Sequence, residues 1–283
     1  MRICRYNDNK LGLVKGNQLI DVTAVLEGLP LVGWPRPHGD AMVAALVNLA
    51  PQIVSNQKLG YVQGVKNVTL RSPIANPTKI IAAPANYMDH ISEAREDVEI
   101  HFGQTIKTID DYGLFLKSTS ALVGPGDGIT LAHTDRRNDH EIELAIIIGQ
   151  TAKNVSEDEA LDVVAGYAIG LDNTVRGVED RSLRKSIDSY AVLGPWLTTA
   201  DEIDNPDDLN FQLRVNGEVR QNSNTRHLIF SCRKLIAYAS KFYTLYPGDI
   251  IMTGTPQGVG PLEVGDLLEC CFDVIGRMEV EVQ

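Results

Sequence analysis

The sequence predicts an α+β fold in which strands predominate. Short apolar runs typical of strands recur along the whole chain and outnumber the segments with helical periodicity. The two kinds of segment do not alternate regularly, which disfavours a doubly wound nucleotide-binding fold. A stretch with two prolines and little periodicity, 70–77, separates a smaller first part from the rest. We therefore expect a small N-terminal β-rich domain over 1–72 and a larger domain over 73–283.

The first part contains two hairpin signals. Strands are expected where apolar residues lie between polar turns, at 2–6, 11–15 and 18–22. A loop rich in proline and glycine, 30–39, then leads to apolar residues at helical spacing over 41–49.

The second part carries most of the expected strands. They fall at 79–83, 114–116, 141–148, 163–171, 208–215, 249–253, 267–272 and 278–282. Helical patterns are expected at 87–95, 156–164 and 231–243. The polar segment 97–112 is aperiodic and too long for a simple connector, so we expect a lid or an active-site loop there.

Charge and composition exclude several classes of protein. The 283 residues include 26 lysines and arginines against 37 aspartates and glutamates, a net charge of −11, so we expect no nucleic-acid partner. No apolar run approaches the roughly 20 residues of a membrane-spanning helix or the length of a signal peptide. The four cysteines are too few and too poorly spaced for a disulfide framework. We expect a soluble, reduced, cytoplasmic protein with no membrane partner.

Two glutamates begin the most apolar strand pattern of the chain. Because side chains alternate along a strand, Glu141 and Glu143 share one face and Ile142 lies on the other. Two carboxylates about 7 Å apart at a buried strand end repel each other unless a cation lies between them. Asp172 ends another apolar run and adds a third carboxylate. Such oxygens suit Mg²⁺ or Mn²⁺; the alternatives are a solvated strand end for the glutamates and a helix N-cap for Asp172.

Further polar residues fall at spacings that suit catalysis. Glu93 follows His90 by three residues, and on a helical turn this carboxylate would orient the imidazole as a general base. The alternative for this pair is a solvated helix surface. After Asp172 the chain is predicted to be helical, which would place Arg176 and Glu179 on one face. The alternative for Arg176 is a surface ion pair.

Two more candidates lie further along the chain. Lys185 could complement a developing enolate, or it could be an ordinary surface lysine. The strand pattern at 249–253 runs into a glycine-rich loop that contains Thr255, whose hydroxyl could hold a substrate carboxylate. This loop lacks the Gly-Lys-Ser/Thr ending of a phosphate-binding loop, so it does not indicate a nucleotide site.

From about residue 79 onward, the sequence resembles the fumarylacetoacetate hydrolase family, in particular its acylpyruvase and oxaloacetate decarboxylase-like branch. The motifs that carry the resemblance occur in the family's order: Asn86-Tyr87 with His90, Phe115-Leu116-Lys117, His140-Glu141-x-Glu143, Leu171-Asp172, Lys185-Ser186, and Gly248-Asp249 through Thr253-Gly254-Thr255-Pro256. The resemblance implies a mixed β-roll catalytic domain, a homodimer, and a bound Mg²⁺, with Mn²⁺ or Ca²⁺ as alternatives.

The resemblance also implies roles by position. The three metal ligands would be Glu141, Glu143 and Asp172. The catalytic residues would be the general base His90, its acid partner Glu93, and Lys185 near the reacting oxygen. The substrate contacts would be Arg176, Glu179 and Thr255. Two positions depart from the family pattern, because Glu179 stands where many relatives carry Gln, and Ser118 stands where Pro is frequent.

The predicted activity is metal-dependent hydrolysis of a C–C bond in a small 2-oxo acid, specifically a 2,4-dioxo acid of the acylpyruvate or fumarylpyruvate type. Alternatives on the same metal–enolate site are decarboxylation or tautomerisation of oxaloacetate, and dehydration or hydration of a sugar acid. A third hypothesis is a dimeric binding protein without catalysis. The presence of all three carboxylates and of His90 disfavours it.

Overall fold

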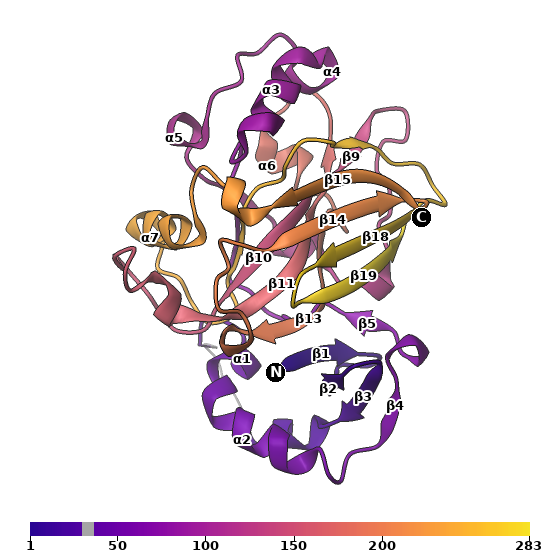
Figure 1. Cartoon of the computed structure of the whole chain (residues 1–283), viewed down its shortest axis with the longest axis vertical. Helices are drawn as coiled ribbons and strands as arrows, with labels where there is room; N and C mark the ends of the chain where they lie inside the picture. Colours follow the sequence, from indigo (N-terminus) through magenta and orange to yellow (C-terminus); the bar gives the residue numbers. More distant parts are fainter. Residues whose placement is uncertain (30–36) are drawn as a thin grey trace.

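The computed structural model describes residues 1–29 and 37–283 (Figure 1). Residues 30–36, which include most of the predicted proline- and glycine-rich loop, lie outside the described residues. Strands predominate over helices, as the sequence predicts. Within the described part of the chain, no helix has both the length and the apolar character needed to cross a membrane.

One mixed sheet runs through most of the described chain. Its neighbouring strands follow the order β4-β3-β2-β1-β13-β11-β10-β16-β6-β7, with β5 beside β1 and β8 beside β13. Their bounds are β1 (Arg2–Tyr6), β2 (Lys10–Lys15), β3 (Gln18–Asp21), β4 (Val62–Gly64), β5 (Leu70–Arg71), β6 (Ile80–Ala82), β7 (Phe115–Lys117), β8 (Leu122–Val123), β10 (Ile142–Ile148), β11 (Val164–Asp172), β13 (Ala191–Thr199) and β16 (Ile250–Met252). β1 pairs antiparallel with β13, so the N-terminal strands extend the sheet of the second part. The domain division at residue 72 stays a prediction.

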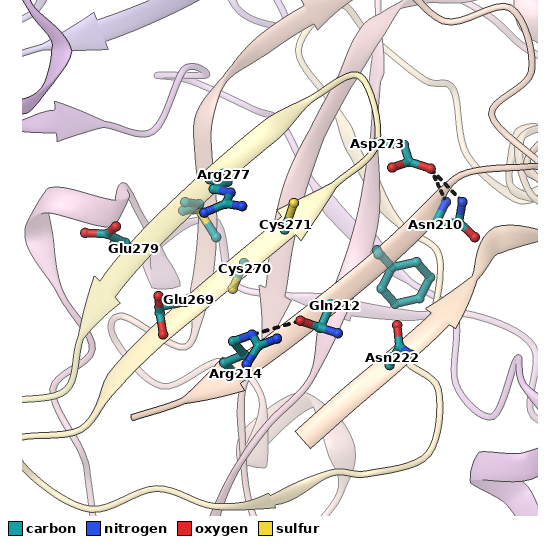
Figure 2. Close-up of a pocket in the computed structure, with 12 residues that line it drawn as sticks. Asn210, Gln212, Arg214, Asn222, Glu269, Cys270, Cys271, Asp273, Arg277 and Glu279 are labelled. Carbon is teal, nitrogen blue, oxygen red and sulfur yellow. Dashed lines mark hydrogen bonds between the residues drawn. The ribbon is translucent and has the colours of Figure 1, made fainter. Parts of the chain in front are cut away.

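Two smaller sheets complete the β structure. One contains β15 (Glu218–Asn224), β14 (Asn210–Val215), β18 (Leu267–Phe272) and β19 (Gly276–Glu281). The other contains β12 (Thr174–Val175), β9 (Asn138–His140) and β17 (Gly260–Pro261). The four-stranded sheet packs Phe211 and Met278 into the core. A polar groove lies on its outer face, where Arg214 Nε donates to Gln212 Oε1 at 2.9 Å (Figure 2).

The strand β10 separates two parts of the hydrophobic core. Ile142, Leu144 and Ile146 pack in one apolar cluster, whereas Ala145 and Ile147 pack in another. This alternation confirms the predicted strand, and full burial on both faces is expected for a central strand. The same alternation places Glu143 on the face of Ala145.

The helices are short and lie mostly at the periphery of the sheets (Figure 1). Their bounds are α1 (Ala41–Ala44), α2 (Leu46–Asn56), α3 (Met88–Glu96), α4 (Val98–His101), α5 (Ile109–Tyr112), α6 (Arg181–Arg184) and α7 (Cys232–Phe242). Short 3₁₀ turns occur at Thr23–Gly28, Val65–Asn67, Thr119–Ala121, Pro125–Asp127, Ala160–Val163, Ala200–Glu202 and Thr225–His227. α3 and α7 confirm the helices predicted at 87–95 and 231–243, and α1 and α2 together cover the one predicted at 41–49.

Four local features differ from the predictions. The segment after Asp172 is not helical, because Thr174 and Val175 pair with Asp139 and Asn138 of β9, so the backbone is committed to a sheet. The predicted helix at 156–164 is reduced to the 3₁₀ turn Ala160–Val163. The central strand β13 was not predicted, because proline is rare inside central strands and Pro195 lies in its interior. The segment 97–112, predicted to be aperiodic, contains α4 and α5.

A buried aspartate fastens β16 to the entry of β6. Asp249 is fully buried, and its carboxylate accepts the backbone N–H groups of Thr78, Lys79 and Tyr246. It also pairs with the ammonium of Lys79. These contacts hold the parallel pair β16–β6, which lies between β10 and the edge strand β7.

We therefore expect D249A to lower the free energy of unfolding by about 3 kcal/mol, because it leaves buried N–H groups and a lysine without their acceptor. D249N, which keeps one acceptor oxygen, should cost less. Urea unfolding followed by circular dichroism measures both variants. An unchanged midpoint for D249A would contradict this role.

Candidate active site

Three carboxylates from separate points of the chain converge at one end of β10 and β11. One oxygen each of Glu141, Glu143 and Asp172 lies within 4.8 Å of the other two, and all three residues are buried. The antiparallel register sets Glu143 opposite Gly170, and the N–H of Asp172 donates to the carbonyl of Glu141 at 2.9 Å. The pairing of these two strands therefore brings together the acids that the sequence predicts as metal ligands.

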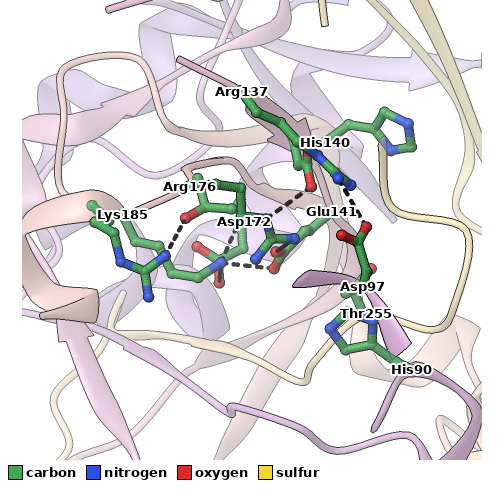
Figure 3. A network of polar contacts seen from close by, with 12 residues as sticks. His90, Asp97, Arg137, His140, Glu141, Asp172, Arg176, Lys185 and Thr255 are labelled. Carbon is green, nitrogen blue, oxygen red and sulfur yellow. Dashed lines mark hydrogen bonds and ion pairs between the residues drawn. The ribbon is translucent and has the colours of Figure 1, made fainter. Parts of the chain in front are cut away.

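Basic side chains already contact two of these acids (Figure 3). Lys185 Nζ donates to Glu141 Oε2 at 2.7 Å and to Asp172 Oδ2 at 2.9 Å. Arg176 Nη2 donates to Glu141 Oε1 at 3.1 Å, and the buried Lys117 pairs with the other oxygen of Asp172. Burial alone would raise the pKa of Glu141, but Lys185 and Arg176 lower it to about 2. Glu141 is thus an ionised acceptor.

Glu143 has no basic partner among the described residues. Its Oε2 accepts the N–H of Gly254 at 2.7 Å. Burial and the negative charges of Asp172 and Glu141 raise the pKa of this carboxyl well above its usual range. A positive charge beside Glu143 would stabilise its ionised form and offset the repulsion between the carboxylates. A set of three oxygen donors with one unpaired buried carboxylate fits a hard divalent cation such as Mg²⁺, Mn²⁺ or Ca²⁺.

A histidine faces the same pocket as the carboxylates. His90 Nδ1 lies 3.0 Å from Glu93 Oε2, and Glu93 Oε1 accepts the N–H of Gly258 at 2.8 Å. Since a carboxylate can only accept here, Nδ1 carries a proton, and in the neutral ring Nε2 is the nitrogen with the free lone pair. The (i, i+3) spacing on α3 therefore produces the oriented imidazole that the sequence predicts.

The structure brings most of the predicted substrate contacts to this pocket. Arg176 and Thr255 line it together with the predicted catalytic residues His90 and Lys185 and the three carboxylates. The Thr255 hydroxyl donates to the carbonyl of Ile142 at 2.9 Å and accepts from Gln221 Nε2 at 2.8 Å. The only hydroxyl proton of Thr255 is therefore engaged within the protein.

Glu179 lies elsewhere. It is not among the residues that line the pocket, and it pairs with Arg136 at 2.8 Å on a partly exposed surface. The helical spacing that would place Glu179 beside Arg176 does not exist, because the intervening residues leave β12 as a loop.

Sequence reasoning missed several residues of the site. Lys117 stood in a family motif, yet nothing in its spacing showed that it would reach Asp172 on another strand. Asp139 was missed as well; it accepts from Arg137 and Arg176, at 2.8 Å each, and Arg137 pairs with Asp97 at 2.8 Å (Figure 3). An acid next to a metal-ligand motif is a weak signal, because surface acids are common there.

Comparison with known proteins gives a consistent result. The family model described as fumarylacetoacetate (FAA) hydrolase C-terminal matches residues 79–283. The maleylpyruvate hydrolase of Aquipseudomonas alcaligenes is 50% identical over 295 residues, which cover 100% of this chain and 99% of the relative. The mitochondrial oxaloacetate tautomerase of Xenopus laevis is 36% identical over 281 residues, which cover 95% of this chain and 83% of the relative.

A solved structure extends the comparison to the fold. The crystal structure of maleylpyruvate hydrolase from Sphingobium sp. SYK-6, in complex with manganese(II) ion and pyruvate, matches with a TM-score of 0.83 and 39% identity. The match covers 100% of this chain and 98% of that chain, and it confirms the predicted α+β, mainly β fold class. With the carboxylates, the histidine and the fold in agreement, this chain belongs to the fumarylacetoacetate hydrolase family.

Proposed function

We propose that this chain is a metal-dependent hydrolase that cleaves a C–C bond in an acylpyruvate. The observation that carries the proposal is the single pocket that holds three convergent carboxylates and an oriented histidine. The 50% identical maleylpyruvate hydrolase and the related structure with manganese(II) and pyruvate support this reaction class.

Glu141, Glu143 and Asp172 would hold the cation, and Mg²⁺ is our first candidate, with Mn²⁺ or Ca²⁺ as alternatives. When bound, the cation supplies positive charge that stabilises the enolate developing on the pyruvate part of the substrate. Lys185 adds a second positive charge at the same place, since its ammonium lies between Glu141 and Asp172.

The histidine and its partner supply the proton chemistry. His90 Nε2 takes a proton from water while Glu93 holds the opposite ring nitrogen. The water oxygen bonds to the C4 carbonyl carbon, the C3–C4 bond breaks, and its electron pair passes to C3. Return of the proton to C3 gives pyruvate and a carboxylic acid from the acyl part.

The segment 97–112 provides a cover for this chemistry. Its residues Ile100, His101 and Tyr112 line the pocket. Arg137 holds the segment in place through its ion pair with Asp97. Burial alone would raise the pKa of Asp97, but the contacts with Arg137 lower it. A closed cover excludes bulk water, which strengthens the electrostatic interactions inside.

Oxaloacetate tautomerisation is a second candidate, because the Xenopus laevis relative carries that name. Decarboxylation of oxaloacetate and sugar-acid hydration or dehydration would use the same enolate-stabilising groups. Parallel assays with acetylpyruvate, maleylpyruvate, fumarylpyruvate and oxaloacetate distinguish these reactions. A homodimer and a cytoplasmic location stay predictions, and light scattering tests the first.

The metal site makes a direct prediction. Changes to residues that only support metal ligands typically weaken metal binding by about 10- to 100-fold. E143Q should weaken Mn²⁺ binding by more than this, because it removes a charged ligand. Calorimetric titration with Mn²⁺ measures this. E269Q on the outer polar groove is the matched control and should bind Mn²⁺ like the unaltered protein. Equal Mn²⁺ affinity in E143Q would remove Glu143 from the ligand set.

The proposed hydrolase reaction makes a second prediction, about activity. Chelator treatment should abolish acylpyruvate cleavage, and added Mg²⁺ or Mn²⁺ should restore it. H90Q should lower kcat by about 100- to 10,000-fold with little change in KM, because the base acts only in the transition state. E93Q should lower kcat less. Full turnover by chelated protein or by H90Q would contradict the mechanism.

A further inference from the structure

The pocket that holds the carboxylates is also rich in arginine. Besides Arg176, it is lined by Arg181 and Arg184 from α6. Among the lining residues that the structure describes, the only acids are Glu141, Glu143 and Asp172. Arg176 and Lys185 already pair with Glu141 and Asp172, and neither arginine of α6 forms an ion pair with an acid of the pocket.

The partners of the two α6 arginines differ. Arg184 donates to neutral acceptors: Nε to the carbonyl of Glu179 at 2.8 Å and Nη1 to the Thr174 hydroxyl at 3.3 Å. Burial and then the charges of Arg176 and Arg181 lower the pKa of Arg184, and the charges of Glu141 and Glu179 offset this lowering only in part. Arg184 is thus held in place by the loop after β12.

The Arg181 guanidinium has no hydrogen bond or ion pair to any other described residue, although the Arg181 carbonyl accepts the N–H of Lys185 at 3.0 Å. The guanidinium lies over the Tyr112 ring at 4.1 Å from the centroid. The Tyr112 hydroxyl is itself fixed, since it donates to the carbonyl of Thr105 and accepts from the N–H of Lys107, both at 3.2 Å. Stacking occupies the face of the guanidinium and leaves its N–H edge for a planar anion.

We propose that Arg181, supported by the charge of Arg184, binds a carboxylate at the far end of the acyl group. This rests on the proposed function, because the pyruvate end of the substrate then lies at the carboxylates and Lys185. The preferred substrates are acylpyruvates whose acyl group ends in a second carboxylate. Arg181 is accordingly a specificity-determining residue, whereas a neutral acyl group gains nothing from it.

The test compares two substrates that differ at this end. Maleylpyruvate carries the terminal carboxylate, and acetylpyruvate ends in a methyl group. R181Q should lower kcat/KM for maleylpyruvate by about tenfold or more and leave that for acetylpyruvate unchanged. R181K should recover part of the loss. R277Q, which removes the same charge from the exposed outer groove, is the matched control and should change neither value.

Two outcomes would overturn the inference. An equal loss for both substrates in R181Q would mean that Arg181 only holds the cover through Tyr112. Equal kcat/KM values for both substrates with the unaltered enzyme would mean that the enzyme does not recognise the terminal carboxylate.

Binding of maleate, the product that keeps the terminal carboxylate, separates this inference from the proposed function. Calorimetry should show weaker maleate binding to R181Q than to the unaltered protein, even if no acylpyruvate is hydrolysed. Identical maleate binding by both proteins would overturn the Arg181 site whatever the reaction is.

Discussion

The site depends on three like charges being buried together. Pairing of β10 with β11 brings one oxygen each of Glu141, Glu143 and Asp172 within 4.8 Å of one another, at the end of two strands that are otherwise apolar. Several kcal/mol per ion oppose such burial unless opposite charge is present. Lys117, Lys185 and Arg176 supply part of that charge to Glu141 and Asp172. Glu143 forms no ion pair with a basic side chain of the described chain, and this imbalance is the physical reason to expect a cation.

The same charges connect the site to its cover. Asp97 pairs with Arg137, Arg137 with Asp139, and Asp139 with Arg176, which reaches Glu141 (Figure 3). Each pair lies within ordinary ion-pair distance, so the ion pairs form one connected chain from Asp97 to Glu141. The cover therefore does more than exclude water, because its position and the arrangement of the carboxylates are parts of one network.

The sequence alone predicted the parts of the site that depend on local pattern. Strand alternation placed Glu143 opposite the Ile142 face, and the (i, i+3) spacing joined His90 to Glu93. Contacts between distant segments were beyond its reach. No spacing shows that Lys117 meets Asp172, since that contact depends on the order of strands in the sheet. The predicted position of Glu179 was wrong for a related reason. The backbone of the segment after Asp172 forms hydrogen bonds with β9 and not within a helix.

Because the segment after Asp172 is not helical, one stretch of chain supplies both a carboxylate and several basic residues to the pocket. After Asp172, β12 and the following loop carry the chain outward to α6, and the chain then returns at Lys185 to contact Asp172 again. The two ends of this excursion meet the carboxylates, and its outermost turn, Arg181–Arg184, meets the cover at Tyr112. Side chains on α6 can therefore change without disturbing the pairing of β10 with β11. If Arg181 binds the acyl end of the substrate as proposed, cation binding and acyl-group selection depend on different residues of the same stretch of chain.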